Sequence, residues 1–213
     1  MIIVVFYGWV RYKAGMKLLI GVPSNRDWKS SFGRSMVGLA VHIAQQNIDC
    51  DVSFKKHVSL LPSGRQQILD EALDGNFTHL LFVDDDTDFN IKAFDLLASR
   101  DKDMVSANMT QKQIPAVPTS RIAGRRISST GKTGIEKVDE TGFGFCLIKL
   151  EALKNIPKPH FEIRWNKDNS QYQPEDFYFC GLLKQNGKEI YADHDAARYV
   201  RHIGNFAYQE TFS

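Results

Sequence analysis

Four aspartates stand within five positions directly after an apolar run, in the stretch Phe82-Val83-Asp84-Asp85-Asp86-Thr87-Asp88. Carboxylates this close disfavour one another's ionised form unless positive charge lies among them. A divalent cation supplies that charge most simply, because oxygen-rich sites suit Mg²⁺ and Mn²⁺. In an extended segment Asp84 and Asp86 point to one side and Asp85 to the other. The cluster predicts a metal site; the alternative is a solvated acidic turn that caps a helix beginning near Asn90.

The spacing argues against two other uses of these aspartates. A calcium-binding EF-hand loop that starts at Asp84 requires Gly at its sixth position and Glu at its twelfth, where the sequence has Phe89 and Asp95. A haloacid-dehalogenase-type phosphatase requires its motif on the first strand with Thr in fifth place, and here Asp88 stands there after the third strand.

The first half of the chain alternates between strand and helix patterns. Apolar or alternating runs predict strands at 18–22, 50–54, 79–83 and 104–107, and helical spacing predicts helices at 33–46, 68–73 and 91–99, with a turn at Pro62-Ser63-Gly64. This order predicts an α/β fold with a mostly parallel central sheet covered by helices on both faces. The aspartates then follow a central strand, at the edge where open α/β sheets bind ligands.

The second half is more mixed. Residues 110–134, rich in Gly, Pro, Ser and Thr, predict a long loop or a weak hairpin. Further patterns predict a strand at 142–150, a helix at 176–185, and short strands at 189–192 and 197–200. Without a repeat or a linker, residues 16–213 are expected to form one domain, and 1–15 an appendage or the product of an upstream start codon.

Composition sets outer limits on function. The chain has 213 residues, 43% hydrophobic and 24% charged, with a net charge of +2, which is too mild to indicate nucleic-acid binding through bulk charge. Three widely spaced cysteines argue against a zinc ribbon or a disulfide scaffold and favour a reducing compartment, so the cytoplasm is expected. The apolar run at 1–10 is about half the length of a membrane span, so no stable span is expected.

Four segments resemble GT-A fold glycosyltransferases that use nucleotide-sugars. The stretch 61–65 and the run into Asp84-Asp85-Asp86 resemble their nucleotide-binding half and its Asp-x-Asp signature. Residues 140–148 resemble the glycine-bearing acceptor-side strand, 174–180 the Glu-Asp motif that opens a helix beneath the acceptor, and 200–204 the late His-x-Gly. Each motif is short, but they occur in the family's order across 16–205.

The resemblance implies a single-domain GT-A (Rossmann-like) fold, with a nucleotide-binding half at 16–108 and an acceptor-binding half at 109–213. It also implies a nucleoside-diphosphate sugar donor, UDP-sugar being favoured, and a bound Mn²⁺ or Mg²⁺. His202 favours Mn²⁺, because imidazole suits the later metals. The implied metal ligands are Asp86, His202 and Asp84, and the implied nucleotide-sugar contacts are Pro23, Ser24, Arg26, Arg65, Asp84 and Asp85.

For catalysis the resemblance implies Asp176 as a general base beside Glu175, in an inverting transfer. A helix N-terminus at this position is expected to keep the Asp176 carboxylate ionised. The alternative is that both acids only charge the first helical turn. The implied acceptor-side residues are Gly142, Phe143, Gly144 and Trp165, for which a strand bend and buried packing are the alternatives.

The acceptor is left open between a saccharide or lipid-linked glycan and a hydroxylated nucleic-acid base. The latter is suggested by the basic residues Arg121, Arg125, Arg126 and Lys132. A nucleotidyltransferase is a second hypothesis, weakened because residues 23–28 contain no glycine; a non-catalytic nucleotide-sugar-binding module is a third. The expected relatives are small glycosyltransferase-like proteins of phages and bacteria, acting in the host cytoplasm if phage-encoded. Sugar and oligomeric state are not predicted.

Overall fold

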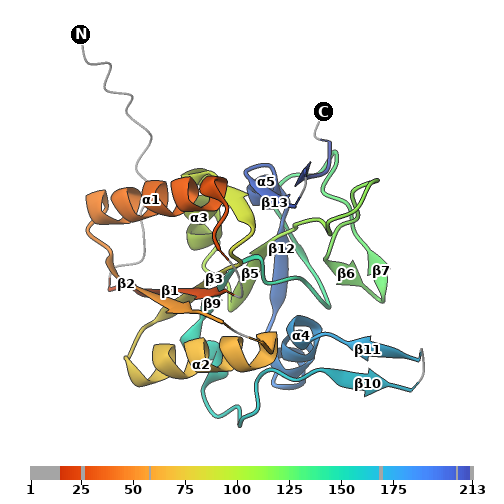
Figure 1. The fold of residues 1–213 in the computed structure, drawn as a ribbon. Helices are drawn as coiled ribbons and strands as arrows, with labels where there is room; N and C mark the ends of the chain where they lie inside the picture. Colours follow the sequence, from red (N-terminus) through yellow and green to blue (C-terminus); the bar gives the residue numbers. More distant parts are fainter. Residues whose placement is uncertain (1–14, 25–26, 58, 168–169, 205, 212–213) are drawn as a thin grey trace.

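A seven-stranded sheet forms the centre of the molecule (Figure 1), as seen in a computed structural model that describes residues 15–24, 27–57, 59–167, 170–204 and 206–211. The strand order is β2-β1-β3-β9-β5-β12-β8. Strands β2, β1, β3, β5 and β12 run in one direction, and β9 and β8 run in the other. Their bounds are β1 Lys17–Pro23, β2 Asp49–Lys55, β3 His79–Val83, β5 Met104–Ala107, β8 Ile135–Lys137, β9 Phe145–Lys149 and β12 Ile190–Asp193.

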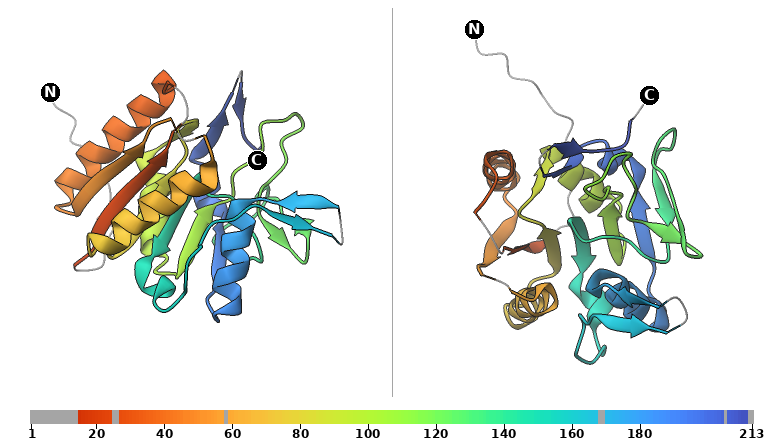
Figure 2. Two further views of the ribbon diagram at one scale, coloured as in Figure 1. Left: turned by 60° about the horizontal axis from the view of Figure 1, so that its bottom comes forward. Right: turned by 45° about the vertical axis from the view of Figure 1, so that its right-hand side comes forward.

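Helices cover both faces of this sheet, as Figures 1 and 2 show. One apolar core lies between the sheet and α1, α3 and α5, and a second lies between the sheet and α2 and α4. Both cores take alternate residues from the same strands; in β1, Leu18 and Ile20 face the first core while Leu19 faces the second. The helices are α1 Ser30–Gln45, α2 Leu61–Asp74, α3 Ile91–Ser99, η1 Leu150–Leu153, α4 Glu175–Gln185 and α5 His194–Ala197.

Three small sheets complete the fold. They are β14-β13-β4, the hairpin β10-β11, which projects from the body of the molecule, and the hairpin β6-β7. Strand β13 pairs antiparallel with β4, which places His202 opposite Thr87, directly after the aspartates. The Ile203 amide also donates to the Asp86 carbonyl at 2.7 Å. The bounds are β4 Thr87–Phe89, β6 Arg121–Ile122, β7 Arg125–Arg126, β10 Arg164–Asn166, β11 Gln171–Gln173, β13 Val200–Ile203 and β14 Ala207–Tyr208.

The predicted α/β fold with a mostly parallel central sheet is confirmed, and β3, α3 and β5 have the predicted bounds. Two local predictions are wrong. Pro62-Ser63-Gly64 is not a turn but the first turn of α2, where a proline's missing N–H costs no helical bond. Ala197 ends α5 instead of opening a strand, because Asp193 caps that helix by accepting from the Asp195 and Ala196 amides.

The predicted strand at 142–150 is shorter in the structure, since β9 begins at Phe145 and η1 follows it. The predicted appendage at 1–15 lies outside the described residues except for Gly15. Among the helices that the structure describes, none is long and apolar enough to cross a membrane.

We expect Gly21→Ala to destabilise the fold by about 1–3 kcal/mol, as over-packing of a filled core does. A β-carbon at Gly21 in β1 would lie 2.3 Å from the Ile68 methyl of α2 and 3.2 Å from Leu80. Urea unfolding measures the loss. Gly33→Ala is the matched control, because no atom lies within 4 Å of its added β-carbon and alanine suits a helix. Equal stability of both variants would contradict the tight packing of α2 on β1.

Candidate functional site

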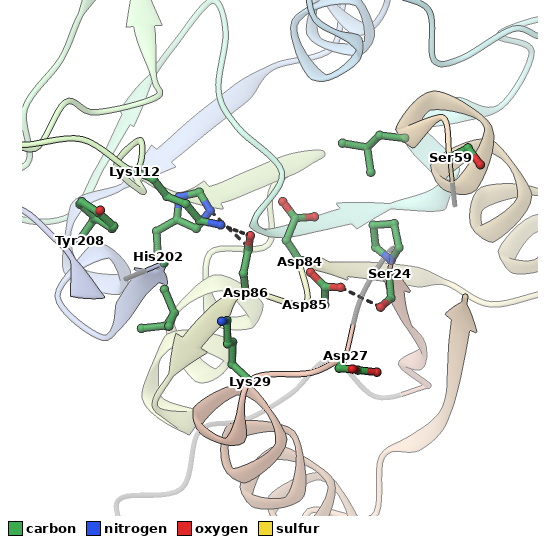
Figure 3. Close-up of a pocket in the computed structure, with 14 residues that line it drawn as sticks. Ser24, Asp27, Lys29, Ser59, Asp84, Asp85, Asp86, Lys112, His202 and Tyr208 are labelled. Carbon is green, nitrogen blue, oxygen red and sulfur yellow. Dashed lines mark hydrogen bonds and ion pairs between the residues drawn. The ribbon is translucent and has the colours of Figure 1, made fainter. Parts of the chain in front are cut away.

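A cavity of about 590 Å³ opens where β1 and β3 end and where β13 meets β4. It brings together residues from distant parts of the chain, which Figure 3 shows converging on one hollow. Asp84, Asp85 and Asp86 enter it from the end of β3, as the sequence predicts for a ligand site at the strand's carboxyl end. The other lining residues are Pro23, Ser24, Asp27, Lys29, Ser59, Leu61, Lys112, His202, Ile203, Gly204 and Tyr208.

Asp86 lies between two cationic or potentially cationic groups. His202 Nε2 is 3.2 Å from Asp86 Oδ1, and the Lys112 ammonium pairs with Oδ2. Burial on its own raises the pKa of Asp86, but hydrogen bonds from His202 and Lys112 outweigh it and hold the pKa at about 2. Asp86 is therefore ionised at any physiological pH, as a metal ligand or a charge anchor must be.

A hydrogen bond to the backbone of Thr110 fixes the orientation of the His202 imidazole. Its Nδ1 is 2.9 Å from the carbonyl oxygen of Thr110, and since a carbonyl only accepts, Nδ1 carries the hydrogen. This leaves Nε2 facing Asp86: it donates to the carboxylate when it also carries a hydrogen, and it offers its lone pair to a cation when it does not. Metal-binding histidines are held in this way, with the far nitrogen donating to a carbonyl.

Two further aspartates of the cluster, Asp85 and Asp88, have separate partners. Asp85 accepts a hydrogen bond from the Ser24 hydroxyl at 2.7 Å, which ties the end of β3 to the end of β1. Asp88 is buried and accepts from Ser35 at 2.8 Å and from Arg201, so it joins β4 to α1 and β13. Asp88 is thus a structural carboxylate outside the cavity. Helix α3 is capped by the Asn90 side chain and not by the acidic cluster.

Arg65 takes an unexpected position. Its side chain is 2% exposed; Nη2 donates to Asp84 at 2.9 Å and Nε donates to Glu175 at 3.2 Å. The guanidinium lies against the rings of Phe82 and Phe143, 5.3 and 5.4 Å from their centroids. This buried position does not fit a direct contact between Arg65 and a nucleotide. Arg65 instead holds Asp84 and Glu175 in place beneath the site.

Asp176 faces a second, smaller cavity beside α4, about 300 Å³ in volume, which Gln111, Arg121 and Tyr172 also line. Burial and the neighbouring Glu175 raise the pKa of Asp176 to about 7. The expectation that a helix N-terminus keeps this carboxylate ionised is therefore met only in part near neutral pH, because burial and Glu175 raise the pKa of Asp176. A carboxyl group with this pKa can accept a proton near neutral pH.

The predicted acceptor-side residues are separated in the structure. Gly144 lies next to the aspartates: its carbonyl accepts from the Asp84 amide at 3.1 Å, and a β-carbon there would lie 2.6 Å from Met109 Sδ, so the Met109 side chain would have to shift. Gly142 packs against Thr119, and Phe143 is 1% exposed beneath Arg65, so this ring serves the core. Trp165 lies on the exposed β10-β11 hairpin. Arg26 lies outside the described residues.

Sequence reasoning missed Lys112, Gln111 and Tyr172. Lys112 lies in a loop with no motif around it. The loop folds back on itself, with residues 109–111 paired to residues 117–119, and this pairing brings Lys112 to Asp86. Tyr172 belongs to a hairpin without a buried face. An exposed aromatic within a polar stretch is the one signal that points to it.

Within the part of the chain that the structure describes, no three His, Cys, Asp or Glu side chains form a ready-made metal centre. Asp86 and His202 provide one carboxylate and one imidazole that face each other, while Asp84 faces Arg65. This donor pair fits a divalent cation that takes its remaining ligands from elsewhere, such as a bound ligand or water.

No protein-family model and no curated protein matches the sequence. Solved structures do match. A197 from STIV is similar over 93% of this chain and 96% of its own, with a TM-score of 0.60 and 16% identity. GalNAc-T7 with UDP, GalNAc and Mn²⁺ matches over 86% of this chain and 43% of its own (TM-score 0.55, 14% identity).

A mutant Drosophila beta-1,4-galactosyltransferase 7, in complex with manganese, UDP-Gal and xylobiose, is similar over 89% of this chain and 72% of its own (TM-score 0.53, 12% identity). The chain thus spans nearly all of A197 but less than half of the GalNAc-T7 structure. At these identities the similarity establishes architecture. The protein has the GT-A fold, as its sequence motifs predict.

We expect Arg65→Met to cost about 3–5 kcal/mol of stability, as breaking one side of a buried ion pair does. The change leaves Glu175, whose side chain is 8% exposed, without its cation. Urea unfolding measures the loss, and Arg65→Met/Glu175→Gln should recover part of it by removing the unpaired charge.

The matched control is Arg164→Met, which breaks a mostly exposed pair with Glu162 and should cost no more than about 1 kcal/mol. A loss in Arg65→Met no larger than in this control would show that the buried cluster does not hold the two halves of the site together.

Proposed function

We propose that this protein is a glycosyltransferase that moves a sugar from a nucleoside-diphosphate donor to a hydroxyl group of an acceptor. One observation carries the proposal: in a GT-A fold, the Asp84–Asp86 segment and His202 line one cavity at the carboxyl edge of the sheet. This is the edge where open α/β sheets bind nucleotides. The GT-A structures described above include two solved with UDP or UDP-Gal, which supports a UDP-sugar as the donor.

We propose that the donor's nucleotide lies along the end of β1. Pro23 and Ser24 line the main cavity there, and a neighbouring hollow is lined by Trp28 and Phe54, whose rings are 4.6 Å apart. We assign the base to this hollow and the diphosphate to the region of Asp86, His202 and Lys112. The Lys112 ammonium offers the diphosphate a positive charge at that point.

A divalent cation, Mn²⁺ or Mg²⁺, fits the pair Asp86 and His202, with Asp84 as a contact through water. Two of the similar structures contain manganese, which supports this part of the proposal. When bound, the cation would act as a Lewis acid that neutralises charge on the leaving diphosphate. The imidazole of His202 favours Mn²⁺ over Mg²⁺.

Asp176 is proposed as the general base of an inverting transfer. The acceptor oxygen forms a bond to the anomeric carbon of the sugar while the bond from that carbon to the diphosphate oxygen breaks. The electron pair of the broken bond leaves with the diphosphate, and the acceptor's proton moves to the Asp176 carboxylate. Glu175 is proposed as a positioning residue: its ion pair with Arg65 fixes the start of α4, where Asp176 follows it.

We expect one UDP-sugar to raise the melting temperature by several degrees in Mn²⁺ and by much less in EDTA, because a ligand stabilises the state that binds it. A thermal-shift panel of UDP- and GDP-sugars measures this. Asp86→Asn and His202→Ala should remove the Mn²⁺-dependent part. Asp70→Asn is the control, because that carboxylate pairs with Lys158 outside the cavity.

An equal shift in EDTA would reject the metal. Absence of any shift, together with pyrophosphate release from a nucleoside triphosphate, would favour a nucleotidyltransferase instead.

We expect Asp176→Asn to lower kcat by about 10²–10⁴-fold, the contribution of a positioned general base, while donor affinity stays the same. Because burial raises the pKa of Asp176 to about 7, wild-type kcat/KM should rise with pH as this group deprotonates and level off above it. UDP release at pH 5.5 to 9 measures the profile, and Asp70→Asn should keep the wild-type curve. Full activity of Asp176→Asn would point to a retaining mechanism, and donor binding without any turnover in the wild type to a non-catalytic binding module.

A further inference from the structure

The smaller cavity beside Asp176 is a groove with its own walls. It lies between the start of α4, the β10-β11 hairpin and the segment from Gln111 to Arg121. The groove and the main cavity border the same stretch of chain, since Gln111 lines the groove and Lys112 lines the main cavity. A molecule in the groove would contact Asp176, and the backbone at 111–112 borders both cavities.

The groove wall is rich in amide side chains, which come from the hairpin and from the 111–121 segment. A primary amide both donates and accepts hydrogen bonds, as does the hydroxyl of a sugar. Pockets that bind small molecules orient them with a few such groups. The amides that line the groove are Gln111, Asn166, Gln171 and Gln173, of which Asn166 lies on β10 and Gln171 and Gln173 lie on β11.

The hairpin also presents two exposed aromatic rings. Trp165 and Tyr172 pair across β10 and β11, with centroids 5.0 Å apart in an edge-to-face arrangement, and they are 52% and 69% exposed. Tyr172 lines the groove. A tyrosine ring offers an apolar face and a polar tip, which matches the C–H face and the hydroxyls of a pyranose ring.

The charge in the groove opposes a phosphate-bearing acceptor. Among the described residues that line it, Arg121 is the one cation, and it is already engaged: Glu140 is 3.7 Å from it and the Phe177 ring lies 4.8 Å below its guanidinium. Two acids, Glu140 and Asp176, line the same groove as that single cation. Nucleic-acid binding relies on several uncompensated cations along the phosphates.

From these features we propose that the groove binds a neutral saccharide as the acceptor, with one sugar ring on Tyr172 and one hydroxyl at Asp176. This deepens the proposed transferase function and rests on it for the transfer step. It decides between the two acceptor classes that the sequence leaves open, since the amides, the ring and the balanced charge all suit a neutral polyhydroxyl chain and not a nucleic-acid strand.

Binding can be measured without turnover. Saturation-transfer difference NMR on the whole protein, with xylobiose, lactose, cellobiose, maltose and di-N-acetylchitobiose as separate probes, should give a signal for at least one of them. Tyr172→Ala should reduce that signal about fivefold or more, and Tyr172→Phe should keep it, because the ring is retained. Ile163→Ala is the matched control: this exposed residue next to β10 does not line the groove.

Turnover separates this inference from the proposed function. With the donor found by thermal shift, the saccharide that binds should stimulate UDP release, and Tyr172→Ala should raise its KM about tenfold while Ile163→Ala keeps the wild-type KM. The inference is overturned if no saccharide binds, if Tyr172→Ala binds as well as wild type, or if a single-stranded oligonucleotide with 5-hydroxymethylcytosine stimulates release instead. Saccharide binding without release from any donor would uphold the groove and reject the transferase.

Discussion

One buried arginine holds the two halves of the site together. Arg65 comes from α2 and pairs with Asp84 at the end of β3 and with Glu175 at the start of α4. Arg65 and Glu175 are 110 residues apart in the sequence. A desolvated guanidinium is costly to bury unless carboxylates and hydrogen bonds compensate it. Asp84 directly follows β3 and Glu175 opens α4, so the ion cluster ties the end of that strand to the start of that helix. Asp176, the next residue after Glu175, is positioned as a consequence.

The aspartate cluster shows how the chain tolerates four carboxylates in five positions. Each has a separate partner: Asp84 has Arg65, Asp85 has Ser24, Asp86 has His202 and Lys112, and Asp88 has Arg201. Repulsion is therefore relieved mainly by cations of the protein, so the cluster's density alone does not require a metal. What supports a cation is the local arrangement at Asp86, where an imidazole held by Thr110 turns its other nitrogen toward the carboxylate.

The fold was largely predictable from local pattern, and the site only in part. Strand β3 is buried along its whole length, so its apolar run identifies it, and Asn90 marks the start of α3 by capping it. The β10-β11 hairpin escaped prediction because its residues are exposed and show no alternation between core and solvent. The motifs placed Asp84–Asp86 and His202 in one cavity, but the burial of Arg65 depends on tertiary packing against Phe82 and Phe143, which no local pattern encodes.

One short segment of chain lines both cavities. Gln111 and Lys112 are neighbours in the chain yet line different cavities, and their position is fixed from both ends: the Gln111 amide donates to Val117 at 2.8 Å, and the Thr110 carbonyl holds His202. The backbone bends between the two cavities at residues 112–115, where the Gln113 amide donates to the Gln111 carbonyl at 2.9 Å. One short bend therefore carries both the Lys112 ammonium that pairs with Asp86 and the Gln111 amide that lines the groove, so the two cavities share a wall of backbone.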